Sequence, residues 1–531
     1  MFSKDPLGEH FQNSIKKDER KLLGQFYTPE EIVAYVVSRV EIDINKKIID
    51  LSCGSGRFLM KAYDNLYTLY MEAKYNQREI HKAILKENLY GIDLNPLAVK
   101  LTEMNLVLKG SEYFPVETNI FEGNSLIKAD TAEDLTLFSS PFEEHQEELK
   151  NILKNNSYDI TIGNPPYLSF GLKGTGKLEK EWHAYIKQRY PFSAQYKIST
   201  YALYLERGIE LLKNGGFLGY ILPDSFLLGR YFSNLRKYIL DTCIIKEIIL
   251  FSKDFWKSGL VGKPVILILQ KEKDKLKRKN NHLKTVYCED PQSLLSGKYL
   301  SYSYRQNTFE KTRHNRFRLF FSKETKDIVE KIEKAEYSLN QVVVFSSGLI
   351  GKKGKNDIIS SKKENKNWYP GLQSSSEIDR YIINHKGGYI SFEKERLKSG
   401  FKKARYFEPK LFLRQTGDSL KAAYDENNFL CLNNLHVGNM INESFDILYI
   451  LAILNSNLMD EYYRTISLES GRALAQIDIE TINELPIKYT DKKNQRKIAN
   501  IVWKIMRQKN PKKIISLEKK LENIITGIYY I

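Results

Sequence analysis

Cysteine is scarce in this chain, with four among 531 residues, at positions 53, 243, 288 and 431. No two of them form a Cys-x-x-Cys pair, so the sequence suggests neither a zinc site nor a disulfide framework. The first residues, Met1 to Asp5, lack an apolar signal region. No apolar run approaches the roughly 20 residues that span a bilayer. These absences favour a cytoplasmic protein with no bound metal and no membrane segment.

The charge is one-sided. There are 82 Lys and Arg residues against 65 Asp and Glu, which gives a net charge of +17 and a pI of about 9.2. Such an excess favours a polyanionic partner, although a general lysine bias is an alternative explanation. The composition, 42% hydrophobic and 28% charged, is typical of globular proteins. A chain of 531 residues is too long for one core, so two or three domains are expected.

The first half of the chain alternates segments with strand and helix patterns. Helices are predicted over residues 57–80, 96–109 and 201–213. Strands are predicted over residues 47–51, 89–93, 118–121, 159–163, 217–222, 244–250 and 265–269. This order predicts an α/β fold with a doubly wound, mostly parallel sheet and helices on both faces.

The second half shows no regular alternation. The charged run over residues 271–284 predicts a solvated loop or a connection near the end of the first domain. After about residue 290, short β-like segments mix with polar ones, and helices are predicted over 446–464 and 490–527. We therefore expect a first domain over residues 1–290, a connecting segment over 291–330 and an α+β domain over 331–531.

A glycine-containing segment follows the first predicted strand: Asp50-Leu51-Ser52-Cys53-Gly54-Ser55-Gly56. Its two glycines let the backbone turn sharply and approach a ligand closely. A dinucleotide fingerprint needs a third glycine, but the chain continues Arg57-Phe58-Leu59, which disfavours a pyrophosphate ligand. The acidic Asp50 would suit a ligand that carries an amino acid cation.

Polar side chains also follow the next two predicted strands. Asp93 could accept both hydroxyls of a ribose, and Asn124 or Ser125 could bond an adenine amino group. Asp93 alone could equally cap the following helix. Three successive strand ends with complementary groups favour a nucleoside ligand over this alternative.

Upstream, the segment Thr28-Pro29-Glu30-Glu31 has the pattern of a capping box. Thr28 would be the N-cap, Pro29 the first helical residue and Glu31 the reciprocal partner. The preceding Phe26 and Tyr27 could line a pocket.

The segment Asn164-Pro165-Pro166-Tyr167 follows the apolar stretch 158–163. The stretch reads as a buried strand, and the two prolines end it and hold the chain extended. An amide, rigid carbonyls and an aromatic ring are thus fixed at a strand end. This arrangement suits gripping a planar group that bears NH2 and stacking on it.

Together, and in this order, these motifs resemble the gamma-class, TaqI-like adenine-N6 DNA methyltransferases of restriction-modification systems. The resemblance implies S-adenosylmethionine as cofactor. The family usually has Asp where this chain has Asn124, and an Asn oxygen can still accept from the adenine amino group. The implied cofactor-binding residues are Tyr27, Thr28, Asp50, Ser52, Gly54, Gly56, Asp93, Leu94, Asn124 and Ser125.

The resemblance also implies the catalytic residues, Asn164, Pro165, Pro166 and Tyr167. Tyr167 and Phe255 would stack on an adenine that has been flipped out of double-stranded DNA. The region 1–290 would be the methyltransferase domain and 331–531 the target-recognition domain. Within the latter, His436 is expected to be structural. Segments that resemble the family's specificity domains are Glu408–Arg414, Leu432–His436, Leu454–Ser456 and Glu484–Ile487.

Other functions stay open at this point. The Asn-Pro-Pro-Tyr motif also occurs in enzymes that methylate the glutamine amide of release factors, and RNA adenine methylation or a non-catalytic DNA-binding homologue are further alternatives. A fused nuclease is not expected, because only 23 residues precede Gly24 and no acidic-acidic-Lys cluster is evident. We expect a monomer on double-stranded DNA in the prokaryotic cytoplasm, associated with the nucleoid, with a possible separate cognate restriction endonuclease.

Overall fold

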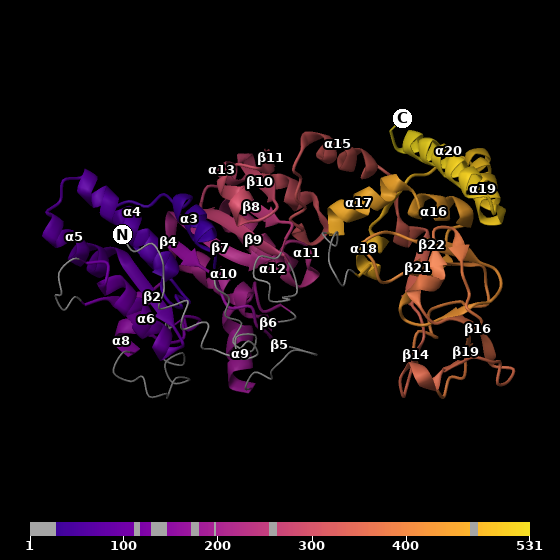
Figure 1. Cartoon of the computed structure of the whole chain (residues 1–531), viewed down its shortest axis with the longest axis horizontal. Helices are drawn as coiled ribbons and strands as arrows, with labels where there is room; N and C mark the ends of the chain where they lie inside the picture. The colour runs from indigo at the N-terminus through magenta and orange to yellow at the C-terminus, as the bar shows by residue number, and fades with distance from the viewer. Residues whose placement is uncertain are drawn as a thin grey trace. The chain divides into compact units, whose positions relative to one another are not determined.

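The computed structural model describes residues 28–110, 117–128, 146–170, 180–195, 198–253, 263–467 and 476–530. The chain divides into two compact units between Ser322 and Lys323 (Figure 1). Each unit is described by itself below.

The first unit is built on one large sheet with the strand order β11-β10-β8-β9-β7-β4-β1-β2-β3. Neighbours pair in parallel except at β7–β9, β8–β9 and β10–β11. Figure 1 shows the labelled strands following one another across the unit, from β2 towards β11. The strands are β1 (Ile48–Asp50), β2 (Leu89–Asp93), β3 (Asn119–Glu122), β4 (Tyr158–Gly163), β7 (Leu212–Pro223), β8 (Cys243–Phe251), β9 (Pro264–Lys271), β10 (His282–Cys288) and β11 (Tyr299–Arg305).

A short strand pair, β5 (Ser169–Phe170) and β6 (Ile198–Ser199), lies outside the large sheet.

Helices connect the strands of the large sheet, as the sequence predicts. The helices are α3 (Glu30–Ser38), α4 (Arg57–Glu72), α5 (Gln77–Ala83), α6 (Pro96–Val107), α8 (Gln146–Ile152), α9 (Lys180–Arg189), α10 (Thr200–Leu211), α11 (Ser225–Leu228), α12 (Ser233–Thr242), α13 (Lys275–Asn280) and α14 (Pro291–Leu295).

The direction of winding changes between β1 and β4. From β1 the chain proceeds outward to β2 and β3, and then returns to place β4 on the other side of β1. In a doubly wound sheet, ligands bind outside the carboxyl ends of the strands at such a switch point. The predicted doubly wound, mostly parallel sheet is confirmed, and the strand ends named above lie around this point.

The first unit extends beyond the predicted boundary at residue 290. The charged run over 271–284 is not a loop: it contains α13 and leads into β10, which pairs with β8. Strand β11, inside the predicted connecting segment, pairs with β10. Alternation explains the difference within the charged run, because Leu283 is buried between the exposed His282 and the half-buried Lys284. Buried Arg236 also donates to the carbonyls of His314 and Asn315, which attaches that segment to this unit.

The second unit is α+β, as predicted. One antiparallel sheet has the order β13-β24-β21-β22, and a second sheet has the order β15-β19-β16-β23. Their strands are β13 (Val343–Ser347), β24 (Leu435–Met440), β21 (Lys410–Arg414), β22 (Ala422–Asp425), β15 (Ile359–Ser360), β19 (Tyr389–Ser391), β16 (Trp368–Leu372) and β23 (Leu430–Cys431). Short pairs are formed by β12 (Tyr337–Ser338) with β25 (Pro486–Ile487), β14 (Ile350–Gly351) with β20 (Leu397–Ser399), and β17 (Ile378–Asp379) with β18 (Ile382–Ile383).

Helices complete this unit. The helix predicted over 490–527 is two helices, because Pro511 begins a new one and the Asn510 side chain accepts from the Lys512 N–H at 3.0 Å. The helices are α15 (Lys323–Ile332), α16 (Ile447–Leu454), α17 (Asn457–Ser467), α18 (Ile479–Asn483), α19 (Lys492–Arg507) and α20 (Pro511–Tyr530).

All four cysteines are buried and free. Within the described residues, no group of three or more His, Cys, Asp or Glu side chains is arranged to hold a metal ion. In the same part of the chain, no helix has both the length and the apolar character needed to cross a membrane.

Candidate active site

The glycine loop after β1 is held by two side chains of α6. The Thr102 hydroxyl donates to the Gly54 carbonyl at 2.8 Å, and the Asn105 amide donates to the Ser55 carbonyl at 3.0 Å. Gly56 has φ +84°, and a Cβ there would lie 2.8 Å from the Thr102 methyl group. At Gly54, no described atom lies within 4 Å of an added Cβ. The loop is therefore fixed on one side and open on the other, as a ligand cradle requires.

Asp93, at the end of β2, is buried against this loop. One carboxylate oxygen accepts from the Gly54 N–H and the other from the Asn95 N–H, each at 2.9 Å. Burial raises the pKa of Asp93, and these N–H groups oppose the rise. The Leu94 N–H also bonds this carboxylate, which leaves it room to accept one further hydrogen bond. The adjacent Leu94 is 61% exposed and places an apolar surface beside the carboxylate.

Asn124 and Ser125 follow β3 and differ in what their side chains contact. The Asn124 amide oxygen accepts from the Leu126 N–H at 3.1 Å, so one of its two lone pairs is used within the turn. The buried Ser125 hydroxyl donates to the Leu51 carbonyl at 2.8 Å. Ser125 therefore ties the end of β3 to the glycine loop, while Asn124 keeps its amide hydrogens and one oxygen lone pair.

Asp50, at the end of β1, is the most enclosed carboxylate of this site. It is 1% exposed and accepts from the Ser52 N–H at 3.0 Å. Burial raises the pKa of Asp50 to about 8; the charge of Asp93 adds to the rise and the Ser52 N–H opposes it. Gly163 packs directly on this group, since a Cβ there would lie 2.6 Å from an Asp50 carboxylate oxygen. Only glycine therefore fits at position 163, directly before Asn164, because a larger side chain would collide with Asp50.

The Asn164 side chain is held at both ends. Its amide nitrogen donates to the Thr28 hydroxyl at 3.1 Å, and the Tyr167 hydroxyl donates to its amide oxygen at 2.7 Å. Tyr167 also contacts the Ile221 carbonyl at 3.1 Å, and the Ser52 hydroxyl donates to the Asn164 carbonyl at 3.4 Å. The amide is thus oriented by Thr28, which precedes α3, by Tyr167, which contacts β7, and by the glycine loop.

The two prolines are positioned by a residue that the sequence motifs do not include. The Thr200 hydroxyl donates to the Pro166 carbonyl and accepts from the Leu168 N–H. Within the described residues, no donor is bonded to the Pro165 carbonyl. Tyr201, the next residue on α10, meets the Tyr167 ring edge-on, with centroids 6.2 Å apart and planes at 89°. No local pattern signals Thr200 or Tyr201, because they lie more than 30 residues from the motif they support.

The predicted capping box is wrong. Helix α3 begins at Glu30 after an N-cap at Pro29 and has no side-chain cap. Thr28 instead places its hydroxyl on Asn164, and its carbonyl accepts from Arg57 at 2.5 Å. The hydroxyl that the local pattern assigns to the helix is used by a strand end 136 residues away. Two other predicted site residues, Tyr27 and Phe255, lie outside the described residues.

Asp50→Asn should change how stability depends on pH. The folded carboxyl has a pKa of about 8, whereas an unfolded one titrates near about 4. Its stability contribution is therefore full below about pH 4 and is lost as pH rises through about 8. Between pH 6 and 9 the wild-type protein should lose roughly 2.7 kcal/mol more unfolding free energy than Asp50→Asn. Urea unfolding at both pH values measures this difference.

The exposed Asp241, which pairs with Lys237, provides the matched control. Asp241→Asn should follow the wild-type pH dependence. Parallel pH curves for wild type and Asp50→Asn would show that Asp50 is ionised in the folded protein at neutral pH.

Comparison with known proteins gives two family matches that lie in separate parts of the chain. Residues 87–256 match the Eco57I restriction-modification methylase model, and residues 372–487 match the TaqI-like C-terminal specificity domain. The first match contains the ends of β2, β3 and β4 with the polar residues described above. The second runs from the end of β16 to β25 in the second unit.

Curated relatives carry the same kinds of names. RM.Eco57I of Escherichia coli, a type II restriction enzyme and methyltransferase, is 30% identical over 50% of this chain and 29% of its own length. PglX of Lacticaseibacillus casei, an adenine-specific methyltransferase, is 22% identical over 83% of this chain and 45% of its own length. The chain thus spans less than half the length of either relative.

Solved structures share the fold. One is the type IIL restriction-modification enzyme MmeI in complex with DNA, with a TM-score of 0.64 at 13% sequence identity. The match covers 100% of this chain and 79% of the MmeI chain. Another is the ATP-dependent type ISP restriction-modification enzyme LlaBIII bound to DNA, with a TM-score of 0.60 at 12% sequence identity. That match covers 94% of this chain and 40% of the LlaBIII chain. The first unit thus has a Rossmann-like fold and contains the methylase match, and the second unit contains the specificity-domain match. In particular, the predicted resemblance to TaqI-like adenine methyltransferases of restriction-modification systems is confirmed.

Proposed function

We propose that this protein is a site-specific DNA methyltransferase that transfers a methyl group from S-adenosylmethionine to the N6 amino group of an adenine flipped out of double-stranded DNA. The observation that carries the proposal is the Asn164 amide, held by Thr28 and Tyr167 at the end of β4, beside the glycine loop. The specificity-domain match in the second unit and the net charge of +17 favour DNA over RNA or a protein glutamine.

The residues present fit S-adenosylmethionine. The Asp93 carboxylate would accept from a ribose hydroxyl, and Leu94 offers an apolar surface for the adenine ring. The space beside Gly54 is open, and it would hold the methionine part of the cofactor. A side chain at this position would occupy that space. Asn124 would bond the cofactor's adenine through its remaining amide groups. When bound, the cofactor supplies an electrophilic methyl group on a positively charged sulfur.

The target amino group needs help from the protein, because its lone pair is delocalised into the adenine ring. The Asn164 side-chain oxygen and the Pro165 carbonyl would each accept one of its hydrogens. Two such acceptors favour a tetrahedral nitrogen whose lone pair is localised for attack. Positioning and electrostatics thus provide most of the catalysis, without a covalent enzyme intermediate.

An adenine inside a duplex cannot reach the end of β4, so the base must be extruded. Tyr167 would stack on it, and its ring is held for that role by its hydroxyl, which contacts Asn164 and Ile221, and by the edge contact with Tyr201. Phe255 would supply the second aromatic surface. We propose methylation alone for this chain, as a monomer on DNA, with any cleavage left to a separate cognate restriction endonuclease.

The direct test uses the purified full chain with radiolabelled S-adenosylmethionine and genomic DNA, followed by sequencing of modified bases. The expected result is label in N6-methyladenine at one recurring sequence. Label in methylcytosine, in RNA or in a release-factor glutamine would contradict the proposal. Transfer that needs added Mg²⁺ or ATP would contradict the metal-free mechanism.

A further inference from the structure

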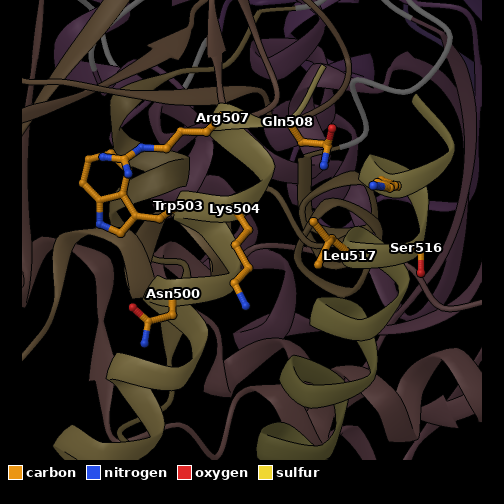
Figure 2. A pocket seen from close by; sticks show the side chains of 8 residues that line it. Asn500, Trp503, Lys504, Arg507, Gln508, Ser516 and Leu517 are labelled. Atoms are coloured by element: carbon orange, nitrogen blue, oxygen red, sulfur yellow. The ribbon is translucent and has the colours of Figure 1, made fainter. Parts of the chain in front are cut away.

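An open groove lies between α19 and α20, the two helices that end the second unit. Its volume is about 780 Å³, which is within the range of about 300–1,000 Å³ of ligand sites. Figure 2 shows the Lys504 side chain extending into the space between the helices and Arg507 lying over the Trp503 ring. The lining residues are Asn500, Trp503, Lys504, Arg507, Gln508, Lys513, Ser516 and Leu517.

Three cations line this groove without a counter-charge. Within the described part of the chain, none of Lys504, Arg507 and Lys513 forms an ion pair with a carboxylate. The two glutamates of α20 are used elsewhere: Glu518 faces Arg380 at 4.0 Å, and Glu522 accepts from the backbone of α17 at 2.8 and 2.9 Å. The groove therefore carries an uncompensated positive charge.

One of the cations is also held in place. The Arg507 guanidinium lies 4.9 Å from the centroid of the Trp503 ring, and Trp503 meets Tyr424 edge-on at 5.9 Å. Stacking fixes the plane of the guanidinium and leaves its N–H edge for a ligand. A planar fork of this kind matches two oxygens of one phosphate.

Basic residues continue along the whole helical pair. From Lys492 to Lys513 the chain has no Asp or Glu, and the first turns of α19 and α20 contain no acid. Cations in a first turn oppose the helix dipole, so helix stability does not explain them. The nine basic residues in this stretch are Lys492, Lys493, Arg496, Lys497, Lys504, Arg507, Lys509, Lys512 and Lys513.

We propose that the α19–α20 groove binds the phosphate backbone of double-stranded DNA, as a second contact beyond the site that holds the target base. The inference rests on the proposed DNA substrate. A repeating polyanion suits an open groove with cations on both walls, and contacts to phosphate add affinity without reading sequence. This surface therefore strengthens binding to any duplex and leaves the choice of target to the rest of the unit.

The test measures binding of the full chain to a duplex without methyl transfer, over a range of NaCl concentrations. Each lost phosphate contact lowers the slope of log K against log salt by about 0.9. Lys504→Gln/Arg507→Gln/Lys513→Gln should lower the slope by about 2–3 and weaken binding at least about tenfold at 50 mM salt. A second variant, Lys504→Glu/Lys513→Glu, keeps the Arg507–Trp503 stack and should likewise lower the slope and weaken binding.

The matched control is Lys273→Gln/Lys275→Gln/Lys279→Gln, which removes three exposed charges from the first unit. Its slope should stay at the wild-type value. Unchanged slopes for the groove variants, or equal losses in the control, would overturn the inference. If the groove variants lost binding to poly-L-glutamate but still bound DNA as the wild type does, the inference would also be overturned. The groove would then be assigned to an acidic protein. Failure of the proposed function looks different, because wild-type protein would then methylate no DNA.

Discussion

Asn164→Ala is expected to lower the rate of methyl transfer to adenine by about 10²–10³-fold while S-adenosylmethionine still binds within about threefold of the wild-type affinity. The substitution removes the amide oxygen that would accept from the target amino group. It leaves Asp93 and the glycine loop untouched, since Asn164 meets that loop through its backbone carbonyl. Single-turnover transfer and equilibrium cofactor binding separate the two effects.

Two further variants sharpen this prediction. Tyr167→Phe keeps the ring and removes the hydroxyl that contacts the Asn164 oxygen and Ile221, so a smaller loss of about tenfold is expected. Asn45→Ala, at an exposed position, should retain full activity. Wild-type turnover in Asn164→Ala would refute the proposed role, and loss of cofactor binding would mean that Asn164 belongs to the cofactor site.

Lys410→Met should destabilise the second unit by about 3–5 kcal/mol. Lys410 and Asp425 face each other on β21 and β22, with both side chains fully buried and 2.5 Å between charged atoms. Burial lowers the pKa of Lys410, and the charge of Asp425 opposes that shift. Removing the lysine would leave a buried carboxylate without its cation. Urea unfolding, with hydrogen exchange of β21 and β22, measures the loss.

The double variant Lys410→Met/Asp425→Asn tests the cause. Asparagine removes the buried negative charge but keeps an acceptor for only one of the N–H groups of Asn427 and Phe429, which bond separate Asp425 oxygens at 2.9 and 3.0 Å. The double variant should therefore recover part of the stability that Lys410→Met loses. Lys237→Met breaks an exposed pair instead and should cost less than about 1 kcal/mol. A loss below about 1 kcal/mol in Lys410→Met would contradict the expected penalty.

The strand ends are predictable from sequence because strand and turn signals are local. Asp50, Asp93 and Asn164 each end an apolar segment, and parallel strands bring such ends to one edge. Two of the predictions that the structure corrects, those for β10 and Thr28, concern features that depend on packing. Strand β10 is hidden in a charged run because only its inward residues, such as Leu283, must be apolar, and Thr28 looks like a helix cap because its distant partner leaves no local mark.

The sequence by itself determined the chemistry that this protein carries: a glycine loop, carboxylates and an amide in a fixed order along a doubly wound sheet. Only the tertiary structure decided how those groups are held. It places the Thr28 hydroxyl on Asn164, makes Gly163 necessary beside Asp50, and, among the residues that it describes, gives Lys504 and Arg507 no carboxylate partner. The physical reason for this division is the sequence distance over which each effect acts. Strand, turn and helix propensities act over a few neighbouring residues. Hydrogen bonds, steric exclusion and charge balance instead join residues that are far apart in the chain.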